Sequence, residues 1–593
     1  MKLKNDPREL AKRLVLAASG QLKADLVIKQ ARLINVYSGE IIPGTDVAVK
    51  YGRIVYVGPN AGHTVGDTTR IIKAQNRFLA PGFIDAHTHL DLYCTPREFV
   101  KGFMRHGTTC VFAEPAEFVS VFGYEGMKLF LREVSGLPIK VFSLVPMCSL
   151  QDPKLGSSRE MSPEEVEEAM GREEVLGLGE TVAWNRILNL DADYFRKMDA
   201  ARSANKRVEG HTAGAHDYKL SALAAAGISS CHEAVQERDV YERLRLGLWT
   251  MLRHGGVRND LAETIPALIK GRLDTRRAIL VSDGMDPGVL AREGHMDLLV
   301  REAITLGLNP VTAVQMASLN PAEHYRMADY IGGVAPGRWA DMVLLNDLRK
   351  VKVHTVISNG RPVSVAGRPL AQLKPFSYPA RYLTSIKIRD KLSPQRFMVR
   401  ASGASARVRV IQFVSESITK ELVWELPIRE GSLLPVPDRD ILKAAVIDRH
   451  WNTGRLCVGF VKGFGSRLGA VASSVNFDEN NLVVIGHREA DMAQAANWIR
   501  QKQGGIVIVD KGKLLETLPL PLAGTCSLKP ASYVGARLNA INQRLRASGS
   551  RLERPLNALI FLTFVTLPRI KMTDRGIVDV KKREFLPLFV VDP

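Results

Sequence analysis

Two histidines that follow an apolar run place the strongest constraint on what this chain can fold into. Phe78–Ile84 is mostly apolar, as expected of a buried strand, and His87 and His89 follow it. Successive strand side chains alternate between faces, so the two imidazoles point the same way. Together they could bind one metal ion, with Asp85 orienting one of the rings. The alternative at this point is a pair of surface histidines.

Apolar runs of strand length alternate with helical patterns from residue 81 to about residue 320. The predicted strands are Phe78–Ile84, Thr109–Ala113, Lys140–Leu144, Val175–Leu178, Arg207–Glu209, Gly227–Ser230 and Ala278–Val281. The predicted helices between them include Ser162–Met170, Asp193–Ala204 and Val235–Arg245. This alternation indicates a parallel sheet, and its regular spacing predicts a (β/α)8 TIM barrel, an α/β fold.

Several of these predicted strands end in side chains that bind metals. They are Glu180, His211, His232 with Glu233 after it, and Asp283. Polar residues at the C-terminal ends of barrel strands carry the chemistry of such folds. Core packing would explain any one of them, but not a series of two imidazoles, a carboxylate, two imidazoles and a carboxylate. The sequence therefore predicts a metal centre.

Further structure is expected on both flanks of the barrel. Residues 1–22 are expected to form a helix, and Leu26–Pro59 reads as a β-meander with glycine turns. We expect a flanking β-sandwich built from both sides of the barrel, and then a linker and a C-terminal α/β domain. The predicted domains are residues 1–80, 81–330, 331–375 and 386–593. In the last of them, the apolar run Leu559–Leu567 is predicted to be a core strand.

Composition restricts the class of protein and its partners. The chain of 593 residues is too long for one hydrophobic core, and 46% hydrophobic with 24% charged residues is typical of soluble proteins. No apolar run reaches the roughly 18 residues that span a membrane. The +19 formal charge is spread out without a nucleic-acid-binding pattern, so we expect neither membrane nor nucleic acid as a partner. Six cysteines without a C-x-x-C pair favour a cytoplasmic protein.

The order His-x-His, carboxylate, His, His, Asp resembles the amidohydrolase superfamily of metal-dependent hydrolases. Within it, the chain resembles the bacterial adenine deaminases nearly from end to end. The matching stretches are Pro81–His89, Ala113–Pro115, Gly177–Glu180, Gly210–Gly214, Ala225–Glu233, Glu293–Asp297, Asn320–Glu323, Ala335–Asp341, Gly459–Gly465, Ala472–Val475 and Thr573–Asp579. The C-terminal stretches are specific to adenine-deaminase-like proteins.

The resemblance implies a metal-dependent deamination of adenine to hypoxanthine and ammonia. His87, His89, Glu180, His211, His232 and Asp283 would hold a binuclear Mn²⁺ or Fe²⁺ centre that activates a hydroxide. Asp283 would move the protons of the reaction, and Glu233 would protonate a ring nitrogen. Glu114, Glu117 and Asp91 would bind the purine-like substrate. A homodimer is the expected assembly.

The chain departs from the family pattern at positions expected near the substrate. Ala116, Phe477 and Asn480 stand where these deaminases usually carry histidines, and Gly284 stands where they carry an aspartate. Asp91 lies where a glutamate is usual. Three hypotheses follow: an adenine deaminase, an amidohydrolase acting on another aminopurine, ring amine, cyclic amide or N-acyl group, and a non-catalytic metal-binding protein. Retention of Glu180, His232 and Asp283 disfavours the last.

Overall fold

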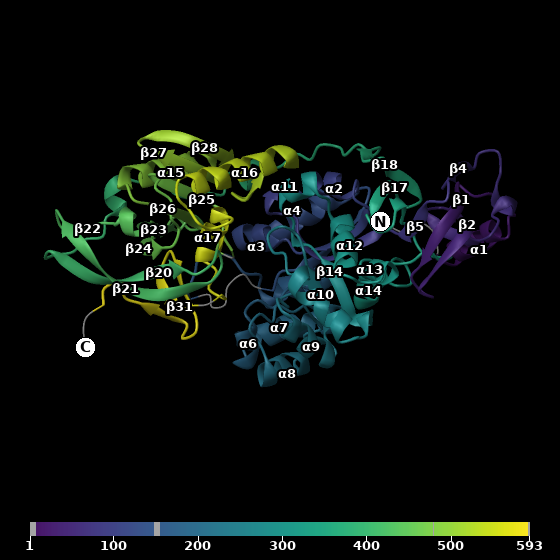
Figure 1. Ribbon diagram of the computed structural model, residues 1–593, viewed down its shortest axis with the longest axis horizontal. Coiled ribbons are helices and arrows are strands. Elements are labelled where there is room, and N and C mark those ends of the chain that lie inside the picture. Colours follow the sequence, from purple (N-terminus) through teal and green to yellow (C-terminus); the bar gives the residue numbers. More distant parts are fainter. Residues whose placement is uncertain (1–6, 148–153, 478, 568, 591–593) are drawn as a thin grey trace.

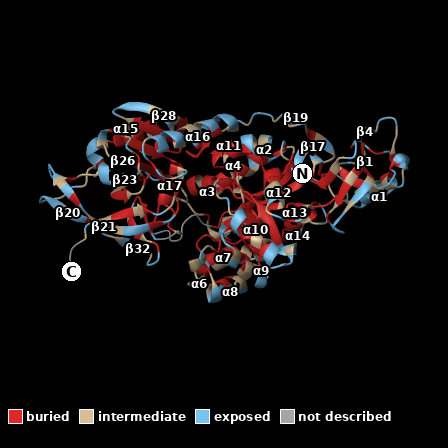
Figure 2. Cartoon of the chain, viewed as in Figure 1, coloured by how far each residue is buried: buried red, intermediate tan, exposed pale blue. Residues whose placement is uncertain are grey.

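The computed structural model describes residues 7–147, 154–477, 479–567 and 569–590. Cys148, Asp478 and the first six residues of the predicted N-terminal helix lie outside this range. A barrel occupies the middle of an elongated molecule, with a β-sheet from its flanks at one end and the C-terminal sheet at the other (Figure 1). Buried residues are concentrated in the barrel and in the C-terminal sheet (Figure 2).

Within the described residues, eight parallel strands form the barrel. They are β6 (Phe83–His89), β8 (Thr108–Ala113), β9 (Lys140–Val145), β10 (Val175–Leu178), β11 (Arg207–Val208), β12 (Ser230–Cys231), β13 (Trp249–Arg253) and β14 (Ala278–Val281). The Ser229 N–H donates to Val208 O across 2.9 Å and joins β11 to β12. β15 (Asp283–Gly284) continues β14 and pairs with β6, which closes the ring. The predicted TIM barrel is confirmed.

Helices follow or connect most of these strands. They are α2 (Pro96–Phe103), α3 (Ala116–Phe122), α4 (Tyr124–Val134), α5 (Pro163–Met170), α6 (Trp184–Leu188), α7 (Ala192–Ser203), α8 (Asp217–Ala225), α9 (Glu237–Arg245), α10 (Leu261–Lys270), α11 (Pro287–Arg292), α12 (Met296–Thr305), α13 (Pro310–Met316) and α14 (Leu319–His324). In the described part of the chain, no helix is long and apolar enough to cross a membrane.

The predicted strand Phe78–Ile84 is wrong as a single element. β5 (Phe78–Pro81) belongs to the flanking sheet, and β6 begins at Phe83 in the barrel. Gly82 separates them, and a Cβ there would lie 2.2 Å from the Thr109 hydroxyl, so only glycine fits where the chain passes from sheet to barrel. Because β6 extends to His89, both histidines lie within the strand itself.

The flanking sheet draws strands from both sides of the barrel, as predicted. Its described strands are β1 (Leu26–Asn35), β2 (Glu40–Lys50), β3 (Arg53–Gly58), β4 (Arg70–Lys73), β5, β16 (Met342–Asp347), β17 (Lys352–Ser358), β18 (Arg361–Val365) and β19 (Arg368–Pro369). Antiparallel pairing of β5 with β16 merges the two flanks into one continuous sheet. Helix α1 (Pro7–Ala18) buries Ala17 in an apolar cluster beside the β1–β3 meander.

The C-terminal region is built on a second large sheet. Its strands, in spatial order, are β22 (Ser432–Leu433), β21 (Thr419–Arg429), β20 (Ser405–Phe413), β24 (Leu456–Lys462), β23 (Ile441–Ile447), β26 (Leu482–Gly486), β25 (Ala470–Ser473), β27 (Gly505–Asp510) and β28 (Lys513–Pro519). Further elements are α15 (Glu489–Lys502), α16 (Ala531–Ala547), α17 (Pro555–Leu562), β30 (Ile570–Thr573), β31 (Gly576–Asp579) and β32 (Glu584–Leu586). β29 (Cys526–Ser527) pairs with β7 (Tyr93–Cys94) and so ties this region to the barrel.

The predicted core strand Leu559–Leu567 is also wrong. The first part of this run lies in helix α17, which begins with Pro555 in its first turn and buries apolar side chains such as Leu559 and Leu562. A short run that is mostly apolar, interrupted here only by Thr563 and Thr566, is compatible with a buried helix as well as a buried strand. The proline favours the helix, because its fixed φ suits a first helical turn.

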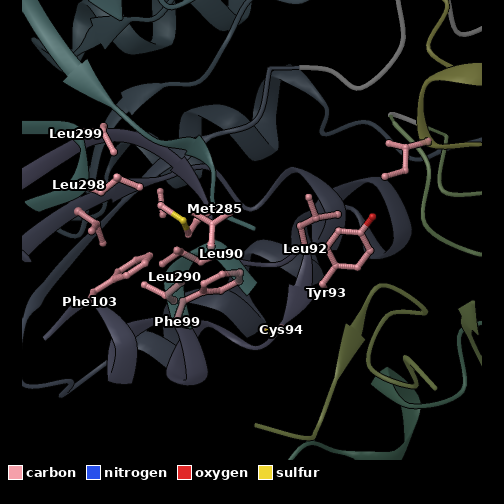
Figure 3. Close-up of a cluster of buried hydrophobic side chains, with 14 of the residues drawn as sticks. Leu90, Leu92, Tyr93, Cys94, Phe99, Phe103, Met285, Leu290, Leu298 and Leu299 are labelled. Atoms are coloured by element: carbon pink, nitrogen blue, oxygen red, sulfur yellow. The ribbon is translucent and has the colours of Figure 1, made fainter. Parts of the chain in front are cut away.

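An apolar cluster anchors the segments that follow β6 and β15. Leu90 and Leu92, which follow His89, belong to the same cluster of buried side chains as Phe99 and Phe103 of α2 (Figure 3). Met285, which follows β15, joins the same cluster. Close packing of these segments holds the ends of β6 and β15 in place.

Candidate metal centre

All six predicted metal ligands converge at the C-terminal ends of the barrel strands. His87 and His89 lie in β6, and Asp283 opens β15. Glu180, His211 and His232 lie in the segments that follow β10, β11 and β12. Because parallel strands of a closed barrel end on one face, residues far apart in sequence meet there.

Glu180 lies at the centre of this group. Its Oε1 is 3.3 Å from His89 Nε2, whereas its Oε2 is 2.5 Å from His211 Nδ1 and 3.0 Å from His232 Nε2. Each carboxylate oxygen therefore faces a different imidazole or pair of imidazoles. Glu180 therefore lies between imidazoles from both halves of the group.

The second half of the group surrounds His87. Asp283 Oδ1 is 3.4 Å from His87 Nε2 and 3.6 Å from His89 Nε2, and the His87 ring stacks on His232 with centroids 4.1 Å apart. His87 is fully buried, yet neither ring nitrogen has a hydrogen-bond partner among the described residues. Nε2 of His211 is likewise buried without a hydrogen-bond partner among the described residues. Buried imidazole nitrogens without partners, facing carboxylate oxygens, fit divalent metal ions.

Backbone and side-chain contacts orient the ligands. The Nδ1 atom of His89 lies 3.1 Å from the carbonyl oxygen of Glu114, so Nε2 faces the centre. The expectation that Asp85 orients His87 or His89 is wrong. Asp85 instead accepts the Ser282 N–H across 3.1 Å and faces Nε2 of His295 at 3.0 Å. Asp85 therefore holds the segment that carries Asp283.

Arg253 is a site residue that the sequence reasoning missed. Its buried guanidinium contacts Glu233, lies 3.0 Å from Asp283 Oδ2 and lies 2.7 Å from Asp260 Oδ2. Arg253 ends β13, the barrel strand that was not predicted. The run Trp249–Arg253, apolar apart from one threonine and ending in a charged residue after helix α9, was the signal that could have revealed it.

Arg253 helps to keep two buried carboxylates ionised. Burial opposes the charge of Glu233, but Arg253, His211 and His232 together lower the pKa of Glu233 to about 2. Burial likewise opposes the charge of Asp283, but contacts with the two β6 histidines and nearby positive charges hold the pKa of Asp283 well below its ordinary value. Both side chains are therefore carboxylates at neutral pH.

The metal centre lies in a cavity of about 330 Å³ between the barrel and the C-terminal region. Glu180, Glu233, Arg253 and Asp283 are the charged groups in its lining that lie at the ligand cluster. The C-terminal region contributes three phenylalanines, Phe477, Phe561 and Phe564, whose ring centroids lie 5.4 to 6.1 Å apart. The lining thus combines charged groups suited to hydrolysis with aromatic side chains suited to an apolar or aromatic ring.

The three predicted substrate-binding residues occupy different positions. Glu117 lines the cavity. Asp91 and Glu114 are buried behind it, where Asp91 accepts the Phe118 N–H and Glu114 accepts the Glu180 N–H, each across 2.8 Å. Asp91 and Glu114 are therefore placed to hold the backbone around the site.

The residues that depart from the family pattern do lie at this site. Ala116, Gly284 and Phe477 line the cavity. Asn480 is fully buried and donates from Nδ2 to Glu117 Oε2. The departures therefore change the cavity wall and its support, whereas the ligand cluster itself is complete.

This fold and ligand cluster define a metal-dependent hydrolase of the amidohydrolase class. The amidohydrolase family model matches residues 78–363, and the model of the adenine deaminase C-terminal domain matches residues 416–584. Curated relatives named adenine deaminase match almost the whole chain. The protein from Cenarchaeum symbiosum is 39% identical over 97% of this chain and 94% of its own length. That from Moorella thermoacetica is 38% identical over 98% of both chains. The chain belongs to the adenine deaminase family, which confirms the resemblance predicted from its motifs.

Proposed function

We propose that this chain hydrolyses adenine at C6 to give hypoxanthine and ammonia. The observation that carries the proposal is the cluster of six ligand side chains around Glu180, open to a cavity that also holds Asp283 and Glu233. Membership in the adenine deaminase family over nearly the full chain supports the same reaction.

We propose a binuclear Mn²⁺ or Fe²⁺ centre held by His87, His89, Glu180, His211, His232 and Asp283. The unpartnered nitrogens of His87 and His211 and the two-sided contacts of Glu180 support this ligand set. When bound, such ions would acidify a water molecule enough for it to attack at neutral pH.

Asp283 is proposed as the base of the reaction. Its Oδ2 is fixed by Arg253 and its Oδ1 faces the two β6 histidines, so the carboxylate cannot rotate freely. Because it is ionised, it can accept the proton of the attacking water and later deliver a proton to the leaving amine.

Glu233 is proposed to protonate a ring nitrogen of the substrate. It lines the cavity beside Arg253 and lies 3.8 Å from His211 Nδ1. Its pKa of about 2 means that it is a carboxylate before the substrate binds. It must therefore take up a proton during the reaction before it can donate one.

A second candidate function is hydrolysis of a different ring amine, cyclic amide or N-acyl group. It is favoured by Ala116, Gly284 and Phe477, because these small or apolar side chains line the cavity where the family pattern has histidine or aspartate. The test is a screen of adenine, other aminopurines, pterins and cyclic amides with the metal-loaded protein. A kcat/KM highest for adenine supports deamination of adenine, and a higher value for another compound overturns it.

The remaining features of the proposal are a cytoplasmic location and a homodimer. The described cysteines, such as Cys94 and Cys526, are unpaired, in keeping with a reducing compartment. The homodimer stays a prediction, which sedimentation of the metal-loaded protein would test.

A further inference from the structure

One acidic side chain of the cavity is held by a residue from the other end of the chain. Glu117 belongs to α3 of the barrel and is 3% exposed. Asn480, between β25 and β26 of the C-terminal region, donates from Nδ2 to Glu117 Oε2 and, across 2.7 Å, to Ser120 Oγ. The position of this carboxyl group therefore depends on the docking of the two regions.

The direction of these hydrogen bonds follows from their neighbours. The Oδ1 atom of Asn480 accepts the Asn476 N–H across 3.4 Å, so Nδ2 is the end that points to Glu117. Ser120 donates its hydroxyl to the Glu117 carbonyl oxygen across 2.9 Å and can therefore accept from Asn480. Glu117 Oε2 is thus an acceptor, and Oε1 is the oxygen left to meet a ligand.

The surroundings of Glu117 favour its neutral form. Among the described residues, no cation forms an ion pair with it, and the amide of Asn480 carries no charge. The guanidinium of Arg449, whose charge acts on Glu117, donates instead to Ser385 Oγ, Ala523 O and Asn480 O. A second buried carboxyl group, that of Asp91, lies behind Glu117. A buried carboxyl group beside another one, without a paired cation, retains its proton.

The electrostatic balance agrees with this geometry. Burial and then the charge of Asp91 raise the pKa of Glu117 to about 8, against the opposing effects of Asn480, His89 and Arg449. At neutral pH the side chain is therefore a carboxylic acid, which has one hydrogen to donate.

We propose that Glu117 is a specificity-determining residue that donates its carboxylic acid O–H to an unprotonated ring nitrogen of the substrate, and that Asn480 positions it. The inference rests on the proposed function and deepens it. It identifies the substrate as a heterocycle with a free ring nitrogen on the side facing α3. A ring bearing N–H at that position is disfavoured, because two donors would then meet.

The test compares two substitutions of Glu117 in adenine binding, measured by calorimetry on metal-loaded protein. All binding measurements use chains that also carry Asp283→Asn, which is expected to keep the metal without consuming adenine, and turnover is followed separately with Asp283 intact. In E117Q, the amide oxygen can accept from Asn480 and the amide nitrogen can donate into the cavity, as the acid does. In E117L, neither bond is possible. We expect E117L to bind adenine roughly 10- to 100-fold more weakly than E117Q. Equal affinities of the two variants would overturn the proposal.

The pH dependence of adenine binding distinguishes a protonated Glu117 from an ionised one. Adenine affinity of the chain with Glu117 intact should fall above about pH 8 as Glu117 ionises, and that of E117Q should not. N480H places a side chain that can become cationic beside Glu117, so the fall should move to lower pH. A fall in E117Q that matches the chain with Glu117 intact would contradict the proposal. E125Q, a change at an exposed residue of α4, is the matched control and should bind adenine unchanged.

Measurement of binding keeps the two proposals distinct. Binding of adenine without turnover when Asp283 is intact would overturn the proposed function and leave the Glu117 comparison valid. A chain that does not bind adenine would overturn both.

Discussion

At the scale of single residues, Glu180 joins the two halves of the metal centre. One of its oxygens faces His89 of β6, and the other faces His211 and His232 from the opposite part of the barrel. Replacement of Glu180 by glutamine would keep the shape of the side chain but would place a neutral amide beside these buried imidazoles. The charge of this carboxylate is therefore what the proposed binuclear centre requires if two cations are to lie close together.

Asp283→Asn is expected to lower the turnover of adenine by roughly 10²- to 10⁴-fold, because the base is lost. Bound metal should be retained, since the other ligands remain. Ammonia release and the metal content per chain, determined on the same sample, check this. Appreciable activity in a metal-loaded variant would contradict the role of Asp283.

Arg253→Met is expected to destabilise the chain by about 3–5 kcal/mol, because Glu233, Asp260 and Asp283 lose the buried cation that they share. Chemical denaturation measures this, and activity should fall as well. Arg245→Met, in helix α9, is the control. If the two variants were equally stable, Arg253 would not be the counter-ion of the site.

The convergence of the six proposed metal ligands was predictable from the sequence, because each lies at or just after the end of a strand. A strand end is marked locally by an apolar run followed by a polar side chain. Arg253 was not predicted as a site residue, because β13, the strand that it ends, was not predicted. The contact between Asn480 and Glu117 could not be predicted, because it joins residues 363 positions apart through the docking of two regions.

At the scale of elements, the closure of the barrel positions Asp283, the proposed base. Asp85 of β6 accepts from the backbone and, across 2.5 Å, from the hydroxyl of Ser282, the residue between β14 and β15. His295, just before α12, contacts the same carboxylate. Asp283 follows Ser282 directly and has a φ of +60°, an uncommon conformation that the closure holds in place.

Asp85→Ala should therefore affect activity without removing a metal ligand. Loss of the acceptor leaves the buried Ser282 N–H and His295 unsatisfied, at a cost of about 1–3 kcal/mol each. We expect a lower free energy of unfolding and a lower kcat, with metal content unchanged. Asp85→Asn keeps one acceptor oxygen, so its free energy of unfolding and its kcat should lie between those of the unmodified chain and Asp85→Ala. Full activity in Asp85→Ala would show that Asp283 is positioned without it.

The type of most elements was predictable, and their boundaries less so. Val175–Leu178 and Ala278–Val281 match the structure, because turn residues limit both runs. The two errors, Phe78–Ile84 and Leu559–Leu567, have different causes. In the first, one extended run passes between two sheets at Gly82, and in the second an apolar run lacks the periodicity that separates helix from strand.

At the scale of the whole molecule, a buried polar network joins the barrel to the C-terminal region. Ser157 of the barrel donates its N–H to Glu479 and its hydroxyl to Asp574, across 2.9 and 3.0 Å. Nε2 of His450 donates to the Glu479 carbonyl across 2.7 Å. This network lies beside the segment that carries Asn480, so it also supports the cavity. The domain limits at residues 80, 330, 375 and 386 remain proposals.

His450 should make the stability of the molecule sensitive to acid. Burial and the nearby charge of Arg449 lower the pKa of His450 to about 3. The unfolded chain binds a proton at this side chain below about pH 6.5, whereas the folded chain does not until about pH 3, so stability is lost as the pH falls through this range.

Between pH 7 and pH 5, protonation of His450 in the unfolded chain should lower the free energy of unfolding by about 2 kcal/mol. His450→Gln removes the titrating group and can keep the hydrogen bond to Glu479. We expect denaturation midpoints of the unmodified chain to fall more over this range than those of the variant. Parallel curves for the two proteins would contradict the burial of a neutral imidazole.

The most direct test of the central claim is a titration of the metal-free chain with Mn²⁺, with adenine present and ammonia and hypoxanthine followed together. Activity should rise to a plateau near two ions per chain, with ammonia and hypoxanthine formed in equal amounts. Two bound ions per chain without release of ammonia would contradict deamination of adenine at this centre.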